Sequence, residues 1–248
     1  MSLEVANDNP QTLSGGSADV GEVTDATAVV RFAIGETLRF LSHAETMRLW
    51  ERACVRAEMP IKYTQGFNPH AKLSLPLPRT VGVAADDERL LVRLFEAGGL
   101  PLGAGETETE ARRLWQEAMQ ARLAAGLVPG LIVHEVLLAR SSISFHPVSA
   151  QYVFALAQTT GLHDKIAGVL GQECLVVDRV SPRRPGGRRV DVRPFLKSIR
   201  LDGTQAIVEC SISDAGSIRV DEIMTLLNIG PADLVAPIRR THVTWKIT

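Results

Sequence analysis

The sequence predicts an α+β fold in which the order strand, helix, strand, strand, helix, strand occurs twice. Three observations lead to this prediction. Runs rich in Val, Ile and Leu alternate with stretches whose apolar residues recur at helical spacing. Gly and Pro mark the boundaries between these segments. Residues 1–28, by contrast, are mostly small and polar with little to bury, so they are predicted to form a disordered tail.

Four strands and two helices are predicted for the first half, residues 29–145. A capping-box pattern, Ser42-His43-Ala44-Glu45, starts the first helix, and Pro60 ends it. The second helix is expected over Glu106–Ala125, and residues 38–41 are expected to be extended. The buried stripe of the first helix is predicted to be Met47, Trp50, Cys54 and Ala57. The predicted strands are Ala28–Ile34, Ala71–Leu75, Glu88–Phe95 and Leu131–Ala139.

A similar order is predicted for the second half, residues 146–248, with an inserted loop over Ser181–Arg193. Helices are expected over His163–Leu170 and Val220–Leu227. The expected strands are Tyr152–Ala157, Cys174–Val180, Phe195–Leu201, Ala206–Ile212 and Ile238–Ile247. This order in both halves is that of the ferredoxin-like arrangement, so tandem ferredoxin-like (βαββαβ) units with antiparallel sheets are predicted.

Composition and charge restrict the class of protein. No apolar run reaches the roughly 18 residues of a membrane span, and the N-terminus lacks a signal-peptide pattern, so a cytoplasmic protein without membrane contact is expected. Residues 1–28 carry five acidic residues and no Lys or Arg, which leaves 27 basic against 23 acidic residues elsewhere. This balance is only mildly basic for a nucleic-acid-binding protein.

Several chemistries lack their usual motifs. The three cysteines, Cys54, Cys174 and Cys210, are too widely spaced for a disulfide framework, a zinc site or an iron–sulfur centre. No cofactor or metal is therefore predicted, and the cysteines are expected to be buried thiols. Phosphate-loop, dinucleotide-binding and Gly-x-Ser-x-Gly patterns are absent, which disfavours nucleotide hydrolysis, hydride transfer and serine-hydrolase activity.

The start of the first helix is one candidate site. Helix capping accounts for Ser42 and Glu45, but it does not account for His43. A histidine in the first helical turn faces the positive end of the helix dipole, which disfavours its protonated form. A neutral imidazole there could accept a proton or bind a metal, and simple capping is the alternative.

The segment Gly66-Phe67-Asn68-Pro69-His70 is a second candidate. Its composition is that of a tight turn, which needs neither an aromatic side chain nor an imidazole. An exposed Phe67 beside His70 and Lys72 would suit stacking on a flat ligand such as a nucleobase.

Two sets of arginines are further candidates. Arg48, Arg52 and Arg56 recur every four residues on one helix face, with Arg39 and Lys62 nearby, and could be a solvated face or a phosphate-binding one. The inserted loop and its flanks could contact phosphate or form a hairpin tip. Its arginines are Arg179, Arg183, Arg184, Arg188, Arg189 and Arg193.

Two blocks, Arg39-Phe40-Leu41-Ser42-His43 and Gly66-Phe67-Asn68-Pro69-His70, resemble the radical-SAM-linked domain of unknown function (domain of unknown function 2344). Weaker similarity continues through about residue 245. It includes Val81-Gly82, residues 127–130 and residues 189–194. The usual Asp after Ser-His is Glu45 here, and Thr64 replaces a Ser. The resemblance implies a partner, a cobalamin-binding radical SAM protein. This chain has no Cys-x-x-x-Cys-x-x-Cys motif for that cluster, so the resemblance implies an accessory role.

The sequence therefore predicts an accessory protein of a radical SAM enzyme that binds or presents a substrate, with RNA or a ribosome-linked macromolecule as the expected substrate. The alternative is a metal-independent endoribonuclease that uses His43 or His70 as general acid or base. The predicted binding residues are Arg39, Ser42, His43, Glu45, Arg52, Arg56, Tyr63, Gly66, Phe67, Asn68, His70, Lys72, Arg183, Arg184, Arg188 and Arg189.

Overall fold

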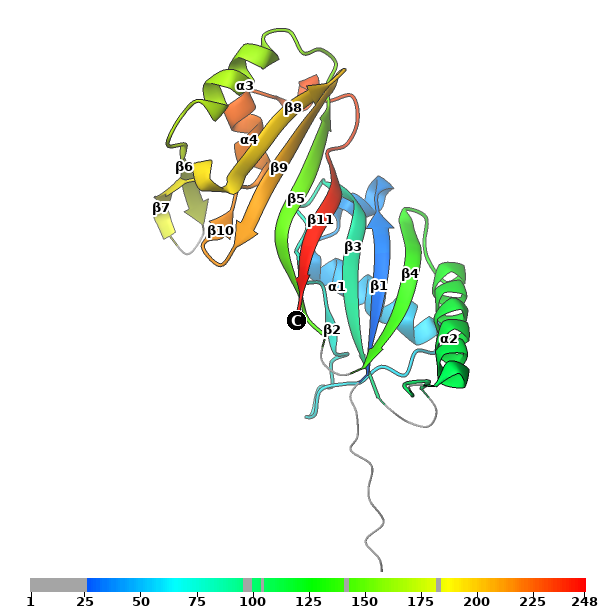
Figure 1. Cartoon of the computed structure of the whole chain (residues 1–248). Coiled ribbons are helices and arrows are strands. Elements are labelled where there is room, and N and C mark those ends of the chain that lie inside the picture. Colours follow the sequence, from blue (N-terminus) through cyan, green and yellow to red (C-terminus); the bar gives the residue numbers. More distant parts are fainter. Residues whose placement is uncertain (1–25, 96–99, 104, 141–142, 182–183) are drawn as a thin grey trace, which may run out of the picture.

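One long sheet runs through both halves of the chain in the computed structural model, which describes residues 26–95, 100–103, 105–140, 143–181 and 184–248 (Figure 1). The strands are β1 (Ala26–Ile34), β2 (Leu73–Ser74), β3 (Ala84–Leu94), β4 (Leu131–Arg140), β5 (Phe145–Ala155), β6 (Val176–Ser181), β7 (Arg184–Asp191), β8 (Leu196–Asp202), β9 (Gln205–Ser213), β10 (Gly216–Ser217) and β11 (Arg239–Ile247). The α-helices are α1 (His43–Arg56), α2 (Glu106–Ala125), α3 (Leu162–Leu170) and α4 (Val220–Leu227). The short 3-10 helices are η1 (Glu36–Phe40), η2 (Arg193–Phe195) and η3 (Pro231–Asp233).

Most neighbouring strands in this sheet are antiparallel. The path is β10-β9-β5-β11-β3-β1-β4, with β2 beside β3 and β8 beside β9. The halves join where β11 runs parallel to the start of β3, with Arg239 opposite Ala84 and Arg240 opposite Ala85. The fold is therefore mixed α/β with a large, mostly antiparallel sheet. The strands of both halves form one sheet, so the structure does not show two separate sheets. The division of the chain into two ferredoxin-like units stays a prediction.

Several predicted boundaries differ from the structure. Helices α2 and α4 have the predicted ends, and α1 ends at Arg56, before Pro60. Strand β5 begins at Phe145, well before the predicted Tyr152. Strand β1 begins at Ala26, inside the predicted tail, and the rest of that tail, residues 1–25, lies outside the described residues.

The sequence predicts that residues 38–41 are extended, and this prediction is wrong. They belong largely to the 3-10 helix η1. The amide of Arg39 donates to the Gly35 carbonyl (3.2 Å) and that of Leu41 to the Leu38 carbonyl (3.1 Å). The Arg79 guanidinium then donates to the carbonyl oxygens of Arg39 (2.5 Å), Leu38 (3.3 Å) and Leu41 (3.3 Å). This distant arginine holds the turn, and local sequence gives no sign of it.

The predicted loop Ser181–Arg193 mostly forms strand β7, which pairs with β6 in a separate two-stranded sheet. The apolar residues Val177 and Val190 lie opposite each other in this hairpin and pack against the core of the second half. Burial of these two side chains, which the surrounding arginines mask in the sequence, explains why a strand replaces the expected loop.

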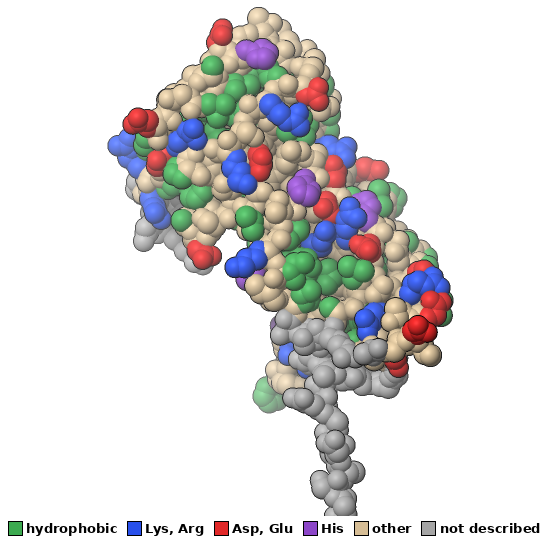
Figure 2. Space-filling model, viewed as in Figure 1, with side chains coloured by type: hydrophobic (Ala, Val, Ile, Leu, Met, Phe, Trp, Pro, Cys, Tyr) green, Lys and Arg blue, Asp and Glu red, His purple; other side chains and the backbone are tan. Residues whose placement is uncertain are grey.

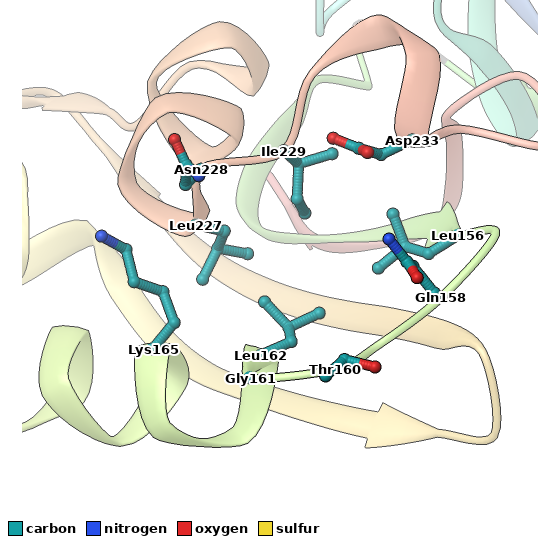
Figure 3. Close-up of a pocket in the computed structure, with 10 residues that line it drawn as sticks. All are labelled: Leu156, Gln158, Thr160, Gly161, Leu162, Lys165, Leu227, Asn228, Ile229 and Asp233. Atoms are coloured by element: carbon teal, nitrogen blue, oxygen red, sulfur yellow. The ribbon is translucent and has the colours of Figure 1, made fainter.

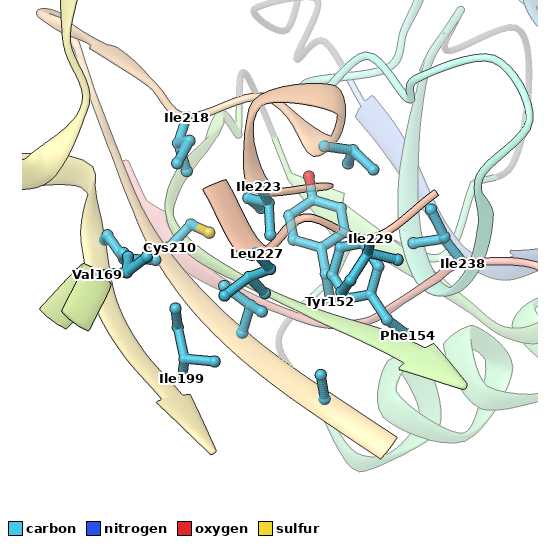
Figure 4. Packing of buried hydrophobic residues seen from close by; sticks show 14 of the residues in the cluster. Tyr152, Phe154, Val169, Ile199, Cys210, Ile218, Ile223, Leu227, Ile229 and Ile238 are labelled. Atoms are coloured by element: carbon cyan, nitrogen blue, oxygen red, sulfur yellow. The ribbon is translucent and has the colours of Figure 1, made fainter. Parts of the chain in front are cut away.

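Each half of the sheet has its own hydrophobic core. In the first half, Trp50 of α1 packs edge-on against Phe32 of β1, with ring centroids 4.7 Å apart, and both side chains are buried. In the predicted stripe of α1, Trp50, Cys54 and Ala57 are buried, whereas Met47 is partly exposed. In the second half, side chains of α3 and α4 pack against the sheet, in a core that includes Tyr152 and Phe154 of β5 (Figure 4).

The outer edge of β4 is covered by helix α2, which lies alongside it (Figure 1). The Leu138 amide donates to the Gln116 side chain (3.0 Å), and the Gln120 side chain donates to the His134 carbonyl (3.1 Å). These bonds satisfy backbone groups that would otherwise be open to another strand. None of the helices in the described ranges is both long enough and apolar enough to cross a membrane.

A buried ion pair joins the two halves. Arg240 of β11 donates from Nε and Nη2 to the two carboxylate oxygens of Glu88 on β3, at 2.8 and 2.7 Å, and both side chains are almost fully buried. The same guanidinium donates to the carbonyls of Leu77 (3.1 Å) and Pro78 (3.3 Å). The pair fixes the connection between β2 and β3 to the second half of the sheet.

Candidate functional site

The start of α1 has the predicted capping box. The Ser42 amide and hydroxyl donate to the Glu45 carboxylate at 2.8 and 2.7 Å, and the Glu45 amide donates to the Ser42 hydroxyl at 3.3 Å. Hydrogen bonds from the Ser42 side chain and backbone lower the pKa of Glu45. Both residues are therefore explained by helix capping, while His43 remains exposed beside them.

A surface hollow of about 610 Å³ lies between η1, α1 and the α2–β4 connection. Its residues are Glu36, Thr37, Leu38, Leu41, Glu45, Arg48, Leu49, Arg52, Val128 and Pro129. Arg48 and Arg52 lie one helical turn apart, on the same face of α1. Among the described residues, neither arginine has a hydrogen-bond or ion-pair partner that would neutralise it. The hollow therefore combines two guanidinium groups that make no hydrogen bond or ion pair, the carboxylates of Glu36 and Glu45, and an apolar wall; Glu45 interacts electrostatically with Arg48.

The wall of the hollow depends on a close backbone approach at Gly130. The Gly35 amide donates to the Gly130 carbonyl (2.8 Å), which draws the α2–β4 connection against the start of η1. Gly130 has φ +89°, and a Cβ atom there would lie 3.1 Å from the Gly35 carbonyl oxygen. Glycine meets both constraints, and this places Val128 and Pro129 at the hollow.

Two of the predicted arginines near the hollow have structural partners. The guanidinium of Arg39 donates to the Glu36 carbonyl (2.5 Å) and lies 4.3 Å from the ring centroid of the exposed Phe40. Arg56 donates to the Gly126 carbonyl (2.8 Å), so it ties the end of α1 to the end of α2. Arg52 thus lines the hollow, whereas Arg56 stabilises helix packing.

The Gly66–His70 segment is a turn with a defined internal structure. The Thr64 amide donates to the His70 carbonyl (2.8 Å), and the His70 amide donates to the Thr64 hydroxyl (2.9 Å). The side chains of Asn68 and His70 approach to 3.5 Å. Phe67 at the tip is fully exposed, as predicted for a stacking residue, and Tyr63 and Lys72 beside the turn are also exposed.

The hollow and the Gly66–His70 turn do not form one site. The Gly82 amide, just before β3, donates to the Arg39 carbonyl, whereas the Lys62 amide donates to the Arg93 carbonyl at the other end of β3. At about 3.3 Å per residue, the strand between these anchors spans roughly 30 Å. His43 belongs to the first end and His70 to the second. They are too far apart to share a metal ion, whose bonds to nitrogen are near 2 Å.

The arginine-rich hairpin divides into structural and exposed residues. Arg179 donates to Glu222 at 2.6 and 2.9 Å, and Arg193 donates to the carbonyls of Leu170, Gln172 and Leu196. Arg188 and Arg189 on β7 are exposed. Of the other predicted residues, Arg183 and the side chain of Arg184 lie outside the described part of the chain.

No group of three His, Cys, Asp or Glu side chains in the described residues is arranged as a metal site. The predicted burial of the cysteines holds for Cys54 and Cys210, and burial raises the pKa of each thiol to about 12. The prediction is wrong for Cys174, which is exposed before β6. The segment before β6 places Leu175, and not Cys174, in the core of the second half, so the thiol lies at the surface beside Asp191.

Some structurally important residues are not among the predicted ones. Arg79, Glu88 and Arg240 were missed, although Glu88 shares the spacing of the apolar Leu90 and Val92 and so had to face the core. The apolar wall of the hollow was also missed. Its members lie on three separate segments, and only tertiary contacts bring them together.

Comparison with curated proteins finds no match. Comparison with protein families finds a match over residues 28–221 to a family described as an uncharacterized protein conserved in bacteria (DUF2344). That span includes the hollow, the Gly66–His70 turn and the arginine-rich hairpin. The chain accordingly belongs to the DUF2344 family.

Proposed function

We propose that this protein is an accessory binding protein, which holds an acidic segment of a macromolecular substrate for a partner enzyme. The observation that carries the proposal is the hollow beside α1, where Arg48 and Arg52 make no hydrogen bond or ion pair with the described residues, although Glu45 interacts electrostatically with Arg48. Guanidinium groups bind carboxylates and phosphates through paired hydrogen bonds, and such charge-assisted bonds are stronger than neutral ones.

The apolar side of the hollow narrows the class of ligand. Leu38, Leu49 and Val128 would pack against apolar groups, while the arginines bind an acidic group on the same ligand. A segment of protein in which acidic and apolar side chains alternate has both features. Small-molecule sites usually bury most of the surface of their ligand. The hollow is open to solvent, so it suits a segment on the surface of a macromolecule better than a small metabolite.

Support for the identity of the partner comes from the sequence resemblance alone. The Arg39–His43 and Gly66–His70 blocks resemble the domain that accompanies cobalamin-binding radical SAM proteins. We therefore propose a radical SAM protein as the partner, with both proteins in the cytoplasm. The strand orders β4-β1-β3-β2 and β8-β9-β5-β11 support the further proposal that the two halves are tandem ferredoxin-like units.

RNA is a weaker substrate proposal than an acidic protein segment. Arg188, Arg189 and Phe67 are exposed and could contact phosphates and bases. However, the face of the molecule seen in Figure 2 carries basic and acidic side chains side by side. Arginines elsewhere in the described chain are paired with acids, as in Arg31–Asp87 and Arg239–Asp86. The face in Figure 2 lacks the excess of positive charge that RNA binding requires. The endoribonuclease alternative needs only one histidine, His43 or His70, as general acid or base, and it stays the second candidate.

Photo-crosslinking in cells tests the proposal directly. A photoreactive amino acid in place of Val128, inside the hollow, is expected to capture a macromolecular substrate, whereas one in place of the exposed Val176 on β6 is not. The double variant Arg48→Glu, Arg52→Glu should abolish capture at Val128, because it reverses both charges. Equal capture from both positions, or capture that survives the charge reversal, would contradict the proposal.

Anaerobic co-purification tests the partner separately. The wild-type chain and the Arg48→Glu, Arg52→Glu variant should both retain the radical SAM protein, because the hollow is assigned to the substrate. The double variant Arg188→Glu, Arg189→Glu serves as a matched control, and its RNA affinity at low and high salt measures any role of the hairpin. RNA cleavage by the chain alone that disappears in His43→Ala would favour the endoribonuclease instead.

A further inference from the structure

A second cavity, far from the hollow, lies at the end of the second half where α3, α4 and η3 meet (Figure 3). It has a volume of about 350 Å³, which is within the range of roughly 300–1,000 Å³ found for small-molecule sites. Its lining comes from the β5–α3 connection, from the first turn of α3 and from the segment after α4. None of its residues belongs to the site described above.

The floor of this cavity is apolar. It is formed by Leu156, Leu162, Leu227 and Ile229, which also belong to the core of the second half. Figure 3 shows these side chains grouped between the polar residues of the rim. Since the core fixes their positions, the cavity is largely formed before any ligand binds.

Polar side chains of different charge stand at the two sides of this floor. Lys165 and Asn228 lie on one side in Figure 3, and Gln158, Thr160 and Asp233 lie on the other. Asn228 has φ +55° and ends α4, which leaves its side chain at the rim. Among the described residues, the side chains of Lys165, Asn228 and Gln158 have no hydrogen-bond or ion-pair partner. Asp233 accepts a bond from the Gly230 amide (2.7 Å) through one carboxylate oxygen, so the other oxygen is available.

We propose that this cavity binds a small amphipathic anion, with its anionic group at Lys165 and Asn228 and its apolar body on the leucine and isoleucine floor. The ammonium group of Lys165 supplies charge, and the Asn228 amide can donate a hydrogen bond to the same oxygen atoms. The other side, at Gln158 and Asp233, accepts hydrogen bonds from donors at the far end of the ligand.

Macromolecular ligands fit this cavity less well than a small molecule does. The cavity is bounded on one side by α3 and on the other by the segment 227–233, and its volume of about 350 Å³ is smaller than that of the hollow, about 610 Å³. A ligand with one charge and a compact apolar body matches both the volume and the distribution of polar groups. The site is independent of the proposed function, because it shares no residue with the hollow.

Fluorescence titration of the full chain with anilinonaphthalene sulfonate tests this inference, because that probe has an apolar ring system and one anionic group. The variant Lys165→Glu should bind the probe at least about tenfold more weakly than the wild type, because a charge-assisted contact becomes a repulsive one. Thr160→Trp should also weaken binding by narrowing the entrance. The control Lys246→Glu, on β11 outside the cavity, should bind as the wild type does.

Competition experiments identify the chemical class of the ligand, and comparison of the variants identifies the cavity that binds it. Octanoate should displace the probe, whereas octanol, which has a similar apolar chain without the charge, should displace it much more weakly. Equal affinity of the wild type and Lys165→Glu would overturn the proposal. So would binding that Arg52→Glu abolishes and Lys165→Glu does not, because the probe would then occupy the hollow beside α1. Thermal unfolding of each variant verifies that a loss of binding does not reflect a loss of folding.

Discussion

Arginines at two places in the molecule, the junction of the halves and the hollow beside α1, have opposite surroundings. At the junction of the halves, Arg240 is buried, pairs with both oxygens of Glu88 and donates to two carbonyl groups. In the hollow beside α1, Arg48 and Arg52 are exposed and have no such partners among the described residues. The sequence shows the same residue type at all three positions.

This difference separates stability from binding. A buried charge must be satisfied within the protein, because leaving it unpaired costs several kcal/mol. An exposed charge is solvated by water and can exchange that water for a ligand. The junction arginine is therefore expected to determine folding, and the hollow arginines are expected to determine binding. Substitutions at the two places should give opposite patterns in stability and binding measurements.

The largest effect is expected at the junction. Arg240→Ala would leave Glu88 buried without its ion-pair partner and should lower the free energy of unfolding by about 3–5 kcal/mol. Urea denaturation measures this change. The double variant Arg240→Met, Glu88→Leu removes both charges and should recover most of the loss. If Arg240→Ala unfolds at the same urea concentration as the wild type, the junction does not depend on this pair.

A smaller effect on stability is expected at Gly130, where the close approach of two backbone segments positions the wall of the hollow. Gly130→Ala places a Cβ atom 3.1 Å from the Gly35 carbonyl oxygen at a φ of +89°. The expected loss of stability is about 1–3 kcal/mol. The matched control is Gly168→Ala in α3, where nothing lies within 4 Å of the added Cβ. That control should stabilise the protein slightly, because alanine favours helices. Calorimetry measures both melting temperatures. Equal values for the two variants would contradict the claim that a Cβ atom at Gly130 strains the backbone.

Loss of the helix cap should cost less. Ser42→Ala removes the side-chain bond to the Glu45 amide and should lower the free energy of unfolding by about 1 kcal/mol. Ser42→Thr keeps the hydroxyl and should retain most of the stability. Chemical denaturation of both variants measures the cap, and a cost near zero for Ser42→Ala would leave Ser42 without its structural explanation.

Low pH should weaken the ion pair between Arg179 and Glu222, which attaches the β6–β7 hairpin to α4. Burial alone would raise the pKa of Glu222, but hydrogen bonds from Arg179 and the Arg219 amide outweigh it and lower the pKa below its ordinary 4.5. A lowered carboxyl pKa stabilises the fold above the ordinary value, and this contribution is lost as the pH falls through the lowered value. The melting temperature of the wild type should therefore approach that of Glu222→Gln below about pH 4.5. A gap between them that stays constant from pH 7 to about pH 3 would contradict this assignment.

The smallest effect on stability is expected at the hollow. Arg48→Glu and Arg52→Glu replace exposed side chains without partners in the described chain, so each should change the free energy of unfolding by less than about 0.5 kcal/mol. Substrate capture at the hollow should nevertheless be lost. If these variants unfold as readily as Arg240→Ala, the contrast between the two places is wrong.

Local sequence patterns predicted the helices better than the site. The capping box at Ser42, the bounds of α2 and α4, and the exposed Phe67 follow from residues near each other in the chain. The hollow could not be predicted in the same way, because it needs η1, α1 and the α2–β4 connection together. The turn at η1 was missed because the guanidinium that donates to its carbonyl groups belongs to Arg79, about forty positions away.

The sequence by itself determined the start of α1, the bounds of α2 and α4, most of the buried stripe of α1, and that Phe67 and His43 are not required by local structure. Tertiary structure decided which arginines stabilise the fold and which are available for binding, because solvation and ion pairing depend on neighbours that are distant in the chain. It placed His43 and His70 at opposite ends of β3, buried Arg240 with Glu88, and left Arg48 and Arg52 in an open hollow. The physical reason is that a charge has the same local propensity in each place, while its free energy depends on the water it loses and the partners it gains.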